Sequence, residues 1–219
     1  MLWEDDEPKP PAARAEAVDV CFPLEGRILP SDYCVPLAEA LAPLLAERAD
    51  PLRTGVRMLH VPLSGNGWCR GQGDVIHVSR RVRLALRVPN ASREAVAALA
   101  GAELSVGCAE LKLGRPRVVE LLAAEPLYAH RVAGKADESE DEFLAAAHEQ
   151  LRGMGVEPRR MLCGRAERLG TPGGALTVRS LLIDGMGADA GLVVQSRGLG
   201  EGRHFGCGLF IPHKSVSPV

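Results

Sequence analysis

The order of the predicted strands and helices constrains this fold more than any other feature, because the same order occurs twice along the chain. In the first half, apolar and polar residues alternate, as in half-buried strands, over 18–22, 56–61, 74–79, 82–88, 103–106 and 110–113. A leucine-rich helix follows the first strand, and we expect Ser31 or Asp32 to cap it and Pro43 to end or kink it early. A short alanine-rich helix begins at Asn90 or Ser92.

The second half repeats this pattern after a boundary near 123–126. Alternating segments predict strands at 127–132, 160–165, 176–183 and 209–211. A long amphipathic helix is predicted over 139–154, where Ser139 and Glu142 have the spacing of a capping box, and a short helix over 188–196. Strand, helix, two strands, helix and strand is the order of the ferredoxin-like split βαβ arrangement. The sequence thus predicts an α+β protein with two tandem ferredoxin-like (RRM-like) domains and a C-terminal glycine-rich loop.

This division gives three segments. Residues 1–16 are polar and contain prolines, so we expect them to be disordered, whereas 17–123 and 124–219 form the N-terminal and C-terminal domains. The chain has 219 residues, enough for two domains of about 100 residues each. Aromatic residues make up only 4%, so broad aromatic surfaces for stacking bases are not expected.

Cysteine spacing and apolar runs exclude several classes of protein. The six cysteines are scattered without a Cys-x-x-Cys pair, so we predict neither a zinc site nor a disulfide framework, and we expect no metal or other cofactor. No stretch approaches the roughly 18 apolar residues of a membrane span, and the N-terminal residues lack the pattern of a signal peptide. We therefore expect a cytoplasmic protein without a membrane partner.

The charged residues are segregated along the chain. The net charge is -2 and the pI is about 6.3, which by itself argues against a nucleic-acid partner. Acidic residues gather at 4–7 and 137–142, whereas arginines gather elsewhere, and we take Arg80, Arg81 and Arg165 as candidate RNA contacts. This separation of the two signs favours an anionic partner.

A glycine-rich run at 198–210 is the strongest functional signal. A cationic pair, Arg203 and His204, stands at its centre, flanked by Gly198, Gly200, Gly206 and Gly208. Because glycine lets the backbone approach an anion closely, we expect these glycines to hold an RNA backbone while Arg203 and His204 contact its phosphates. The run lacks the lysine of a Walker loop, and a predicted helix precedes it where a dinucleotide fingerprint needs a strand.

The same run resembles the signature loop of the RAMP superfamily of CRISPR-associated proteins, through Gly198-Leu-Gly, five further residues and Gly206-Cys-Gly-Leu-Phe. Within that superfamily, the chain is similar to the repeat-cleaving endoribonucleases (the Cas-six family) in their myxobacterial-type variant. Further similar segments are Phe22-Pro-Leu-Glu-Gly-Arg-Ile-Leu-Pro-Ser-Asp32, Leu84-Ala-Leu-Arg-Val-Pro89, Leu127-Tyr-Ala-His-Arg-Val132 and Phe210-Ile-Pro-His-Lys214. The resemblance spans about 18 to 215, nearly the whole chain.

The resemblance implies that CRISPR repeat RNA is the partner and is cut without a metal, through attack of a 2′-hydroxyl on the neighbouring phosphate, to give mature guide RNAs. Such a reaction needs a base for the 2′ proton and an acid for the 5′ oxygen. The candidates are His60, at the end of a predicted strand beside a glycine loop, Tyr33 and Ser31. Tyr33 stands where similar sequences are expected to carry a histidine, and tyrosine, with an ordinary pKa of about 10, is a poor base.

Two other functions stay open. A non-catalytic subunit that holds the 3′ hairpin of a guide RNA, within an effector complex of further CRISPR subunits, is favoured by the tyrosine at position 33. A ferredoxin-like regulator that binds a small molecule or nucleotide is compatible with the glycine run and the acidic pI. Binding of a repeat RNA separates the regulator from the other two, and formation of a cleavage product separates the nuclease from the subunit.

Overall fold

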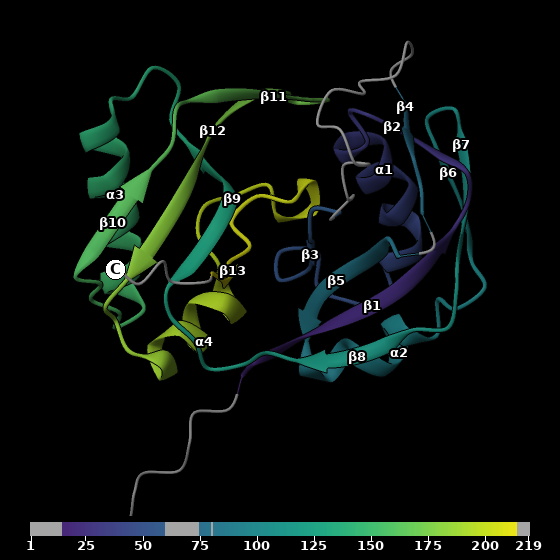
Figure 1. Ribbon diagram of the computed structural model, residues 1–219, viewed down its shortest axis with the longest axis horizontal. Coiled ribbons are helices and arrows are strands. Elements are labelled where there is room, and N and C mark those ends of the chain that lie inside the picture. The colour runs from purple at the N-terminus through teal and green to yellow at the C-terminus, as the bar shows by residue number, and fades with distance from the viewer. Residues whose placement is uncertain (1–14, 60–74, 80, 214–219) are drawn as a thin grey trace, which may run out of the picture.

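Two large antiparallel sheets, each packed against helices, and one two-stranded sheet make up the described part of the protein (Figure 1). The structure is a computed structural model, and it describes residues 15–59, 75–79 and 81–213. In each half of the chain, the main strands and helices follow one another in the predicted order, so the tandem ferredoxin-like architecture is confirmed. None of the helices in these ranges is both long and apolar enough to cross a membrane.

The N-terminal sheet has its first strand in the middle. Its unit contains β1 (Ala17–Glu25), β2 (Ile28–Pro30), α1 (Cys34–Leu45), β3 (Gly55–Val56), β4 (Val75–His77), β5 (Arg83–Pro89), η1 (Asn90–Ser92), α2 (Arg93–Ala97), β6 (Glu103–Val106), β7 (Ala109–Leu113) and β8 (Arg117–Glu120). Strand β1 pairs with β5 on one side and with β8 and then β7 on the other, and β3 lies beyond β5. Strands β2 and β4 form a separate pair.

The C-terminal sheet repeats this arrangement. Its unit contains β9 (Leu127–Gly134), α3 (Glu140–Gly153), β10 (Arg160–Cys163), β11 (Glu167–Thr171), β12 (Gly174–Asp184), α4 (Ala188–Arg197), η2 (Arg203–Phe205) and β13 (Ile211–Pro212). Strand β9 lies between β12 and β13, and β10 lies beyond β12. The order β10-β12-β9-β13 therefore matches β3-β5-β1-β8 of the first sheet strand for strand, as expected for two copies of one split βαβ arrangement.

Each sheet buries one face beneath its helices. On β1, Val18, Val20 and Phe22 are fully buried in a cluster that includes residues of α1 and α2. On β9, Leu127 belongs to a second cluster that includes residues of α3 and α4. Because alternate side chains of a strand share one face, this burial explains why the alternating pattern predicted the strands. The first cluster ends at Leu113 and the second begins at Leu127, on either side of the predicted boundary, whose exact place stays a prediction.

Helix α1 differs from the expectation at both ends. Its N-cap is Tyr33, whose side chain makes no capping hydrogen bond, so the prediction that Ser31 or Asp32 caps the helix is wrong. The helix also does not end at Pro43 but continues to Leu45. A proline so close to the end of a helix removes one backbone hydrogen bond from the last turn only, and the tertiary packing of α1 outweighs this cost.

The C-terminal unit contains one confirmed local motif and one strand that was not predicted. The capping box of α3 is confirmed, because Ser139 Oγ accepts a hydrogen bond from the Glu142 N–H at 3.2 Å and the Glu142 carboxylate accepts one from the Ser139 N–H at 2.8 Å. Strand β11 pairs with the start of β12 across a tight turn at Pro172-Gly173. Its segment mixes charged residues with glycine, which hid the strand pattern.

Candidate functional site

The start of α1, the segment after β3 and the glycine-rich loop (198–210) meet between the two sheets (Figure 1). Both α1 and β3 contact η2, the short helix inside this loop. A Cβ atom at Gly206 would lie 3.2 Å from the Val56 carbonyl oxygen and 3.3 Å from the Met58 side chain, so the loop passes directly against the end of β3. Elements from both units are thereby brought together where the described chain reaches Leu59.

Tyr33 is buried at this junction and holds the segment that follows β3. The residue is 6% exposed, and its hydroxyl oxygen accepts a hydrogen bond from the Leu59 N–H at 3.0 Å. Burial raises the pKa of Tyr33 to about 12, so the phenol keeps its proton at neutral pH and does not act as a base. This hydrogen bond holds the backbone of Leu59, the residue before His60, against the start of α1.

Arg131 connects α1 to the glycine-rich loop beside Tyr33. Its Nη1 donates a hydrogen bond to Cys34 Sγ at 3.2 Å, and its carbonyl oxygen accepts one from the Gly208 N–H at 2.7 Å. The neighbouring Cys207 is fully buried, and burial raises the pKa of its thiol to about 11. Cys207 is therefore a packing residue and not a nucleophile.

The glycines of the loop allow it to fold back on itself. Positive φ angles occur at all four predicted positions: Gly198, Gly200, Gly206 and Gly208. A side chain at Gly208 would collide with the Leu199 carbonyl, and one at Gly198 would collide with the Gly208 carbonyl. The Leu199 N–H donates to that Gly208 carbonyl at 3.2 Å and closes the loop. The close backbone approach that was predicted for an RNA strand is thus already required by the loop's own chain.

Of the cationic pair at the centre of the loop, only His204 faces solvent. Arg203 is 7% exposed, and its guanidinium donates to the backbone carbonyls of Arg197, Ser196 and Arg53. His204 is exposed and packs against the neighbouring phenylalanine ring, with 3.9 Å between the ring centroids, and partial burial lowers its pKa. Arg203 is turned toward the protein, so His204 is the exposed member of the pair.

The remaining predicted residues are spread over the molecule. Ser31 is exposed ahead of α1, Arg81 is exposed ahead of β5, and Arg165 is exposed between β10 and β11. His60 and Arg80 lie outside the described residues. Among the described residues, no group of three or more histidine, cysteine, aspartate or glutamate side chains is arranged to hold a metal ion.

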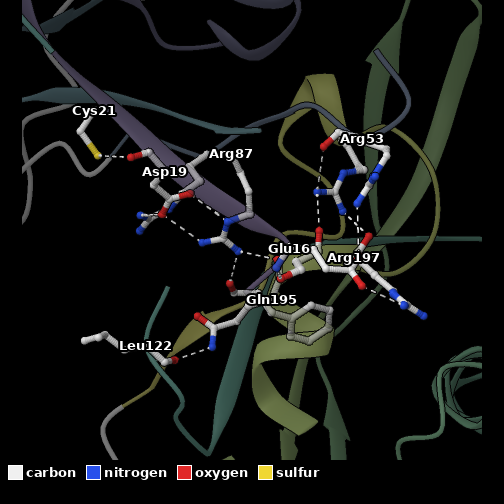
Figure 2. Close-up of polar contacts among 12 residues, drawn as sticks. Glu16, Asp19, Cys21, Arg53, Arg87, Leu122, Gln195 and Arg197 are labelled. Carbon is white, nitrogen blue, oxygen red and sulfur yellow. Dashed lines mark hydrogen bonds and ion pairs between the residues drawn. The ribbon is translucent and has the colours of Figure 1, made fainter. Parts of the chain in front are cut away.

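A buried ion network between the two sheets was not predicted. Figure 2 shows the contact between Asp19 on β1 and Arg87 on β5. These two residues are 3% and 1% exposed. The Oδ1 atom of Asp19 lies 2.8 Å from Nε of Arg87, and its Oδ2 lies 2.7 Å from Nη1 of Arg57. Nη1 of Arg87 also donates to two carbonyls of the C-terminal unit, at 3.1 Å to Gln195 and 2.6 Å to Phe210. The network therefore joins the two units through charge-assisted hydrogen bonds.

The position of Asp19 explains why its burial was hard to foresee. Asp19 and Arg87 lie directly opposite each other in the pairing of β1 with β5, on the face that points away from the helices. That face is covered by the C-terminal unit, which strand alternation cannot reveal. Burial alone would raise the pKa of Asp19, but Arg87 and Arg57 outweigh this effect and hold the pKa below its usual value. The sequence feature that could have indicated this ion pair is the presence of one charged residue inside each of two otherwise apolar strands.

Comparison with known proteins gives one consistent family. A family model described as Cas6 (Cas6 Crispr) matches residues 18–215. A curated relative, "CRISPR-associated endonuclease Cas6" of Myxococcus xanthus (strain DK1622), is 32% identical over an alignment of 198 residues, and the match covers 89% of this chain and 81% of the relative.

Two solved structures share the fold. One described as "CRISPR associated protein Cas6" has a TM-score of 0.62 at 12% sequence identity, and the match covers 91% of this chain and 100% of the other. Another, described as the CRISPR endoribonuclease Cse3 bound to 19 nt RNA, has a TM-score of 0.53 at 15% identity, with 93% of this chain and 100% of the other covered. At these identities the similarity concerns the arrangement of the two sheets and their helices.

Proposed function

This chain belongs to the Cas6 family of CRISPR RNA-processing endonucleases, and from this premise we propose that it cleaves the repeat RNA of a CRISPR precursor transcript without a metal ion. The products are mature guide RNAs. The partner is the repeat RNA itself, and the guide RNA that remains after cleavage can stay bound for assembly with other CRISPR effector subunits. We propose that the enzyme acts in the cytoplasm.

In the proposed reaction, the 2′ oxygen upstream of the scissile phosphate forms a bond to phosphorus while the bond from phosphorus to the 5′ oxygen breaks. The products carry a 2′,3′-cyclic phosphate and a 5′-hydroxyl. We assign the acceptance of the 2′ proton to His60, because imidazole has an ordinary pKa of about 6.5 and exchanges protons readily near neutral pH. Ser31, exposed ahead of α1, is a second candidate for hydrogen bonding to the reacting oxygens.

The hydrogen bond between Tyr33 and Leu59 is the observation that carries this assignment. It fixes the backbone one residue before His60 against the start of α1, at 3.0 Å from the phenol oxygen. The glycine-rich loop lies against the same segment through Gly206. The segment up to Leu59 is thus held from two sides, and we propose that this reduces the entropy lost when the base that follows it meets the substrate.

Repeat RNA is proposed to lie across exposed cations that both units present. His204 in the glycine-rich loop and Arg81 and Arg165 on the two units present exposed side chains. Arginine suits phosphate because its planar fork donates two hydrogen bonds at once. Gly198, Gly206 and Gly208 are buried and shape the loop, so the exposed Gly200 is proposed to be the glycine whose backbone the RNA contacts.

Tyr33→Phe tests the positioning role. The variant leaves the buried Leu59 N–H without its acceptor, and we expect single-turnover cleavage to slow by up to about 10²-fold, the cost of misplacing a reacting group. Repeat binding should stay near the wild-type level. The shape of the pH–rate profile should also stay unchanged, because a phenol that keeps its proton contributes no ionisation to the reaction.

Tyr128→Phe is the matched control, since Tyr128 is the second of the two tyrosines in the chain and lies on β9. It should cut at the wild-type rate. Loss of one limb of the pH–rate profile in Tyr33→Phe would instead make Tyr33 the base, and an unchanged rate would remove it from the mechanism.

The proposed function is tested by incubating excess protein with a labelled repeat RNA in EDTA. We expect a single cut, with a 2′,3′-cyclic phosphate on one product and a 5′-hydroxyl on the other. A requirement for added divalent metal, or a 3′-hydroxyl with a 5′-phosphate at the cut, would contradict the proposal.

A non-catalytic RNA-binding subunit is the second candidate. The observation that favours it is Tyr33, which is buried and fully protonated where similar sequences are expected to carry a histidine. This function predicts tight binding of the repeat RNA with no product after prolonged incubation. Under the nuclease proposal, the same incubation converts all bound RNA.

A further inference from the structure

A pocket lined by charged residues lies where the two units meet, apart from the junction at Tyr33. It has a volume of about 320 Å³ and is lined by Glu16, Leu52, Arg53, Ser196, Arg197 and Arg203. The segment from Arg53 to Leu59 connects the pocket to the candidate cleavage site, and an extended chain of this length spans up to about 20 Å. Neither Tyr33 nor Leu59 lines the pocket, which is therefore distinct from the junction although Arg53 leads into β3.

Two of its arginines share one carboxylate. Glu16 lies between Arg53 and Arg197 (Figure 2), with its carboxylate oxygens 3.2 Å from Nη2 of the first and 3.1 Å from Nη2 of the second. All three side chains are about half exposed, at 48% for Glu16, 51% for Arg53 and 47% for Arg197. Solvent and ions therefore reach these groups, and one of the two positive charges has no full counterion in the pocket.

Arg203 adds a third guanidinium, and it is buried. In the described part of the chain, no carboxylate lies within ion-pair distance of it, and its hydrogen bonds go to backbone carbonyls alone. Two of these contacts are long, at 3.4 Å, and the buried Nε has no partner among the described residues. Burial and the neighbouring Arg87 and Arg53 lower the pKa of Arg203 to about 10, so the group is still charged at neutral pH.

A buried charge without a counterion is costly, and proteins normally pair such a charge or bind an ion there. Three guanidiniums around one carboxylate leave the pocket two positive charges in excess. Arginine forks match the oxygens of a phosphate group in both geometry and charge. The volume is several times the ~30 Å³ that one water molecule occupies in the liquid, so it admits a phosphate group without displacing Glu16.

We propose that this pocket is an anion site that binds one phosphate group. The phosphate is either free phosphate or a phosphodiester of a bound RNA strand, since the recognising chemistry is the same. The site goes beyond the proposed cleavage reaction, which uses neither Arg53 nor Arg197.

The first arm of the test is a titration of the whole protein with inorganic phosphate at constant ionic strength, followed by calorimetry or by NMR. Wild-type protein should show saturable binding with one site. Arg197→Gln should weaken it about tenfold, the effect of losing one charge-assisted hydrogen bond. Glu16→Gln should tighten it about two- to fivefold, because the competing carboxylate charge is gone.

Arg152→Gln is the matched control, because Arg152 is an exposed arginine of α3 that pairs with Glu149 and Glu157 and does not line the pocket. It should bind phosphate like the wild type. All of these substitutions are at exposed side chains, so the proteins should fold, and equal melting temperatures would verify that.

The second arm measures repeat RNA affinity against salt concentration. If the site takes an RNA phosphodiester, Arg197→Gln should lower the slope of log affinity against log salt by roughly 0.7 to 1, the contribution of one phosphate contact. If Arg197→Gln weakens phosphate binding but leaves the salt slope of RNA affinity unchanged, the site binds free phosphate. Absence of saturable phosphate binding together with an unchanged slope overturns the proposal, as does equal phosphate binding by Arg197→Gln and Arg152→Gln. Neither arm depends on cleavage, so a failure of the anion-site proposal can be told apart from a failure of the nuclease proposal.

Discussion

Replacing Asp19 by asparagine is expected to lower the free energy of unfolding by about 3 to 5 kcal/mol, the cost of removing one partner of a buried ion pair. Arg87 is 1% exposed and would keep its charge while losing the carboxylate 2.8 Å away. The carbonyls of Gln195 and Phe210 would remain as acceptors, but they do not neutralise a charge. Denaturant unfolding followed by circular dichroism measures the loss.

The exposed arginine of α3 provides the control for this prediction too. Arg152 pairs with Glu149 at 3.4 Å and with Glu157 at 3.2 Å, and exposed pairs of this kind contribute about 0 to 1 kcal/mol. Arg152→Gln should therefore lose no more than that. If Asp19→Asn cost as little as Arg152→Gln, the network would not hold the two units together as described.

The effect of Asp19 should also depend on pH. Its folded pKa is lower than its unfolded one, because Arg87 and Arg57 outweigh the effect of burial. Its stabilising contribution is thus fully present above the ordinary aspartate value of about 3.9 and is lost as the pH falls through the lower folded value. The stability difference between wild type and Asp19→Asn should therefore be constant near neutral pH and shrink in acid.

His60→Ala is expected to slow single-turnover cleavage by about 10²- to 10⁴-fold, the usual contribution of a positioned base or acid. Repeat affinity should change little, because the phosphate contacts are assigned to other residues. Added imidazole should restore part of the rate, since it can supply the missing base from solution.

His148→Ala is the matched control for this variant. His148 lies on α3, where its Nε2 is 3.2 Å from a Glu157 carboxylate oxygen. The control should cut at the wild-type rate. Wild-type cleavage by His60→Ala would remove His60 from the mechanism, whereas loss of binding in that variant would assign it to RNA recognition.

The sequence predicts those parts of the fold that depend on neighbouring residues. The α3 capping box was found because Ser139 and Glu142 interact across one helical turn. The two tandem units were found because alternation marks the buried face of each strand. Helix α1 shows the limit of local rules, because tertiary packing starts it at Cys34 without a side-chain cap and continues it through Pro43.

The parts of the site that were not predicted depend on contacts between distant segments. The pairing of Asp19 with Arg87 joins residues 68 positions apart, and the bonds from Arg87 reach 108 and 123 positions along the chain. Tyr33 was foreseen as a site residue, but its bond to Leu59, on which the proposed positioning role depends, spans 26 positions. Likewise, Arg203 was foreseen as a phosphate contact on the loop surface and lies buried beside a pocket that no local pattern marks.

The most direct test of the central claim compares two repeat RNAs in EDTA that differ in one atom. One is entirely ribonucleotide, and the other carries a single 2′-deoxy nucleotide immediately upstream of the scissile phosphate. We predict equal binding of both, complete single-site cleavage of the first and no cleavage of the second. Cleavage of the deoxy-substituted RNA at the same site, or no cleavage of either RNA, would contradict the account.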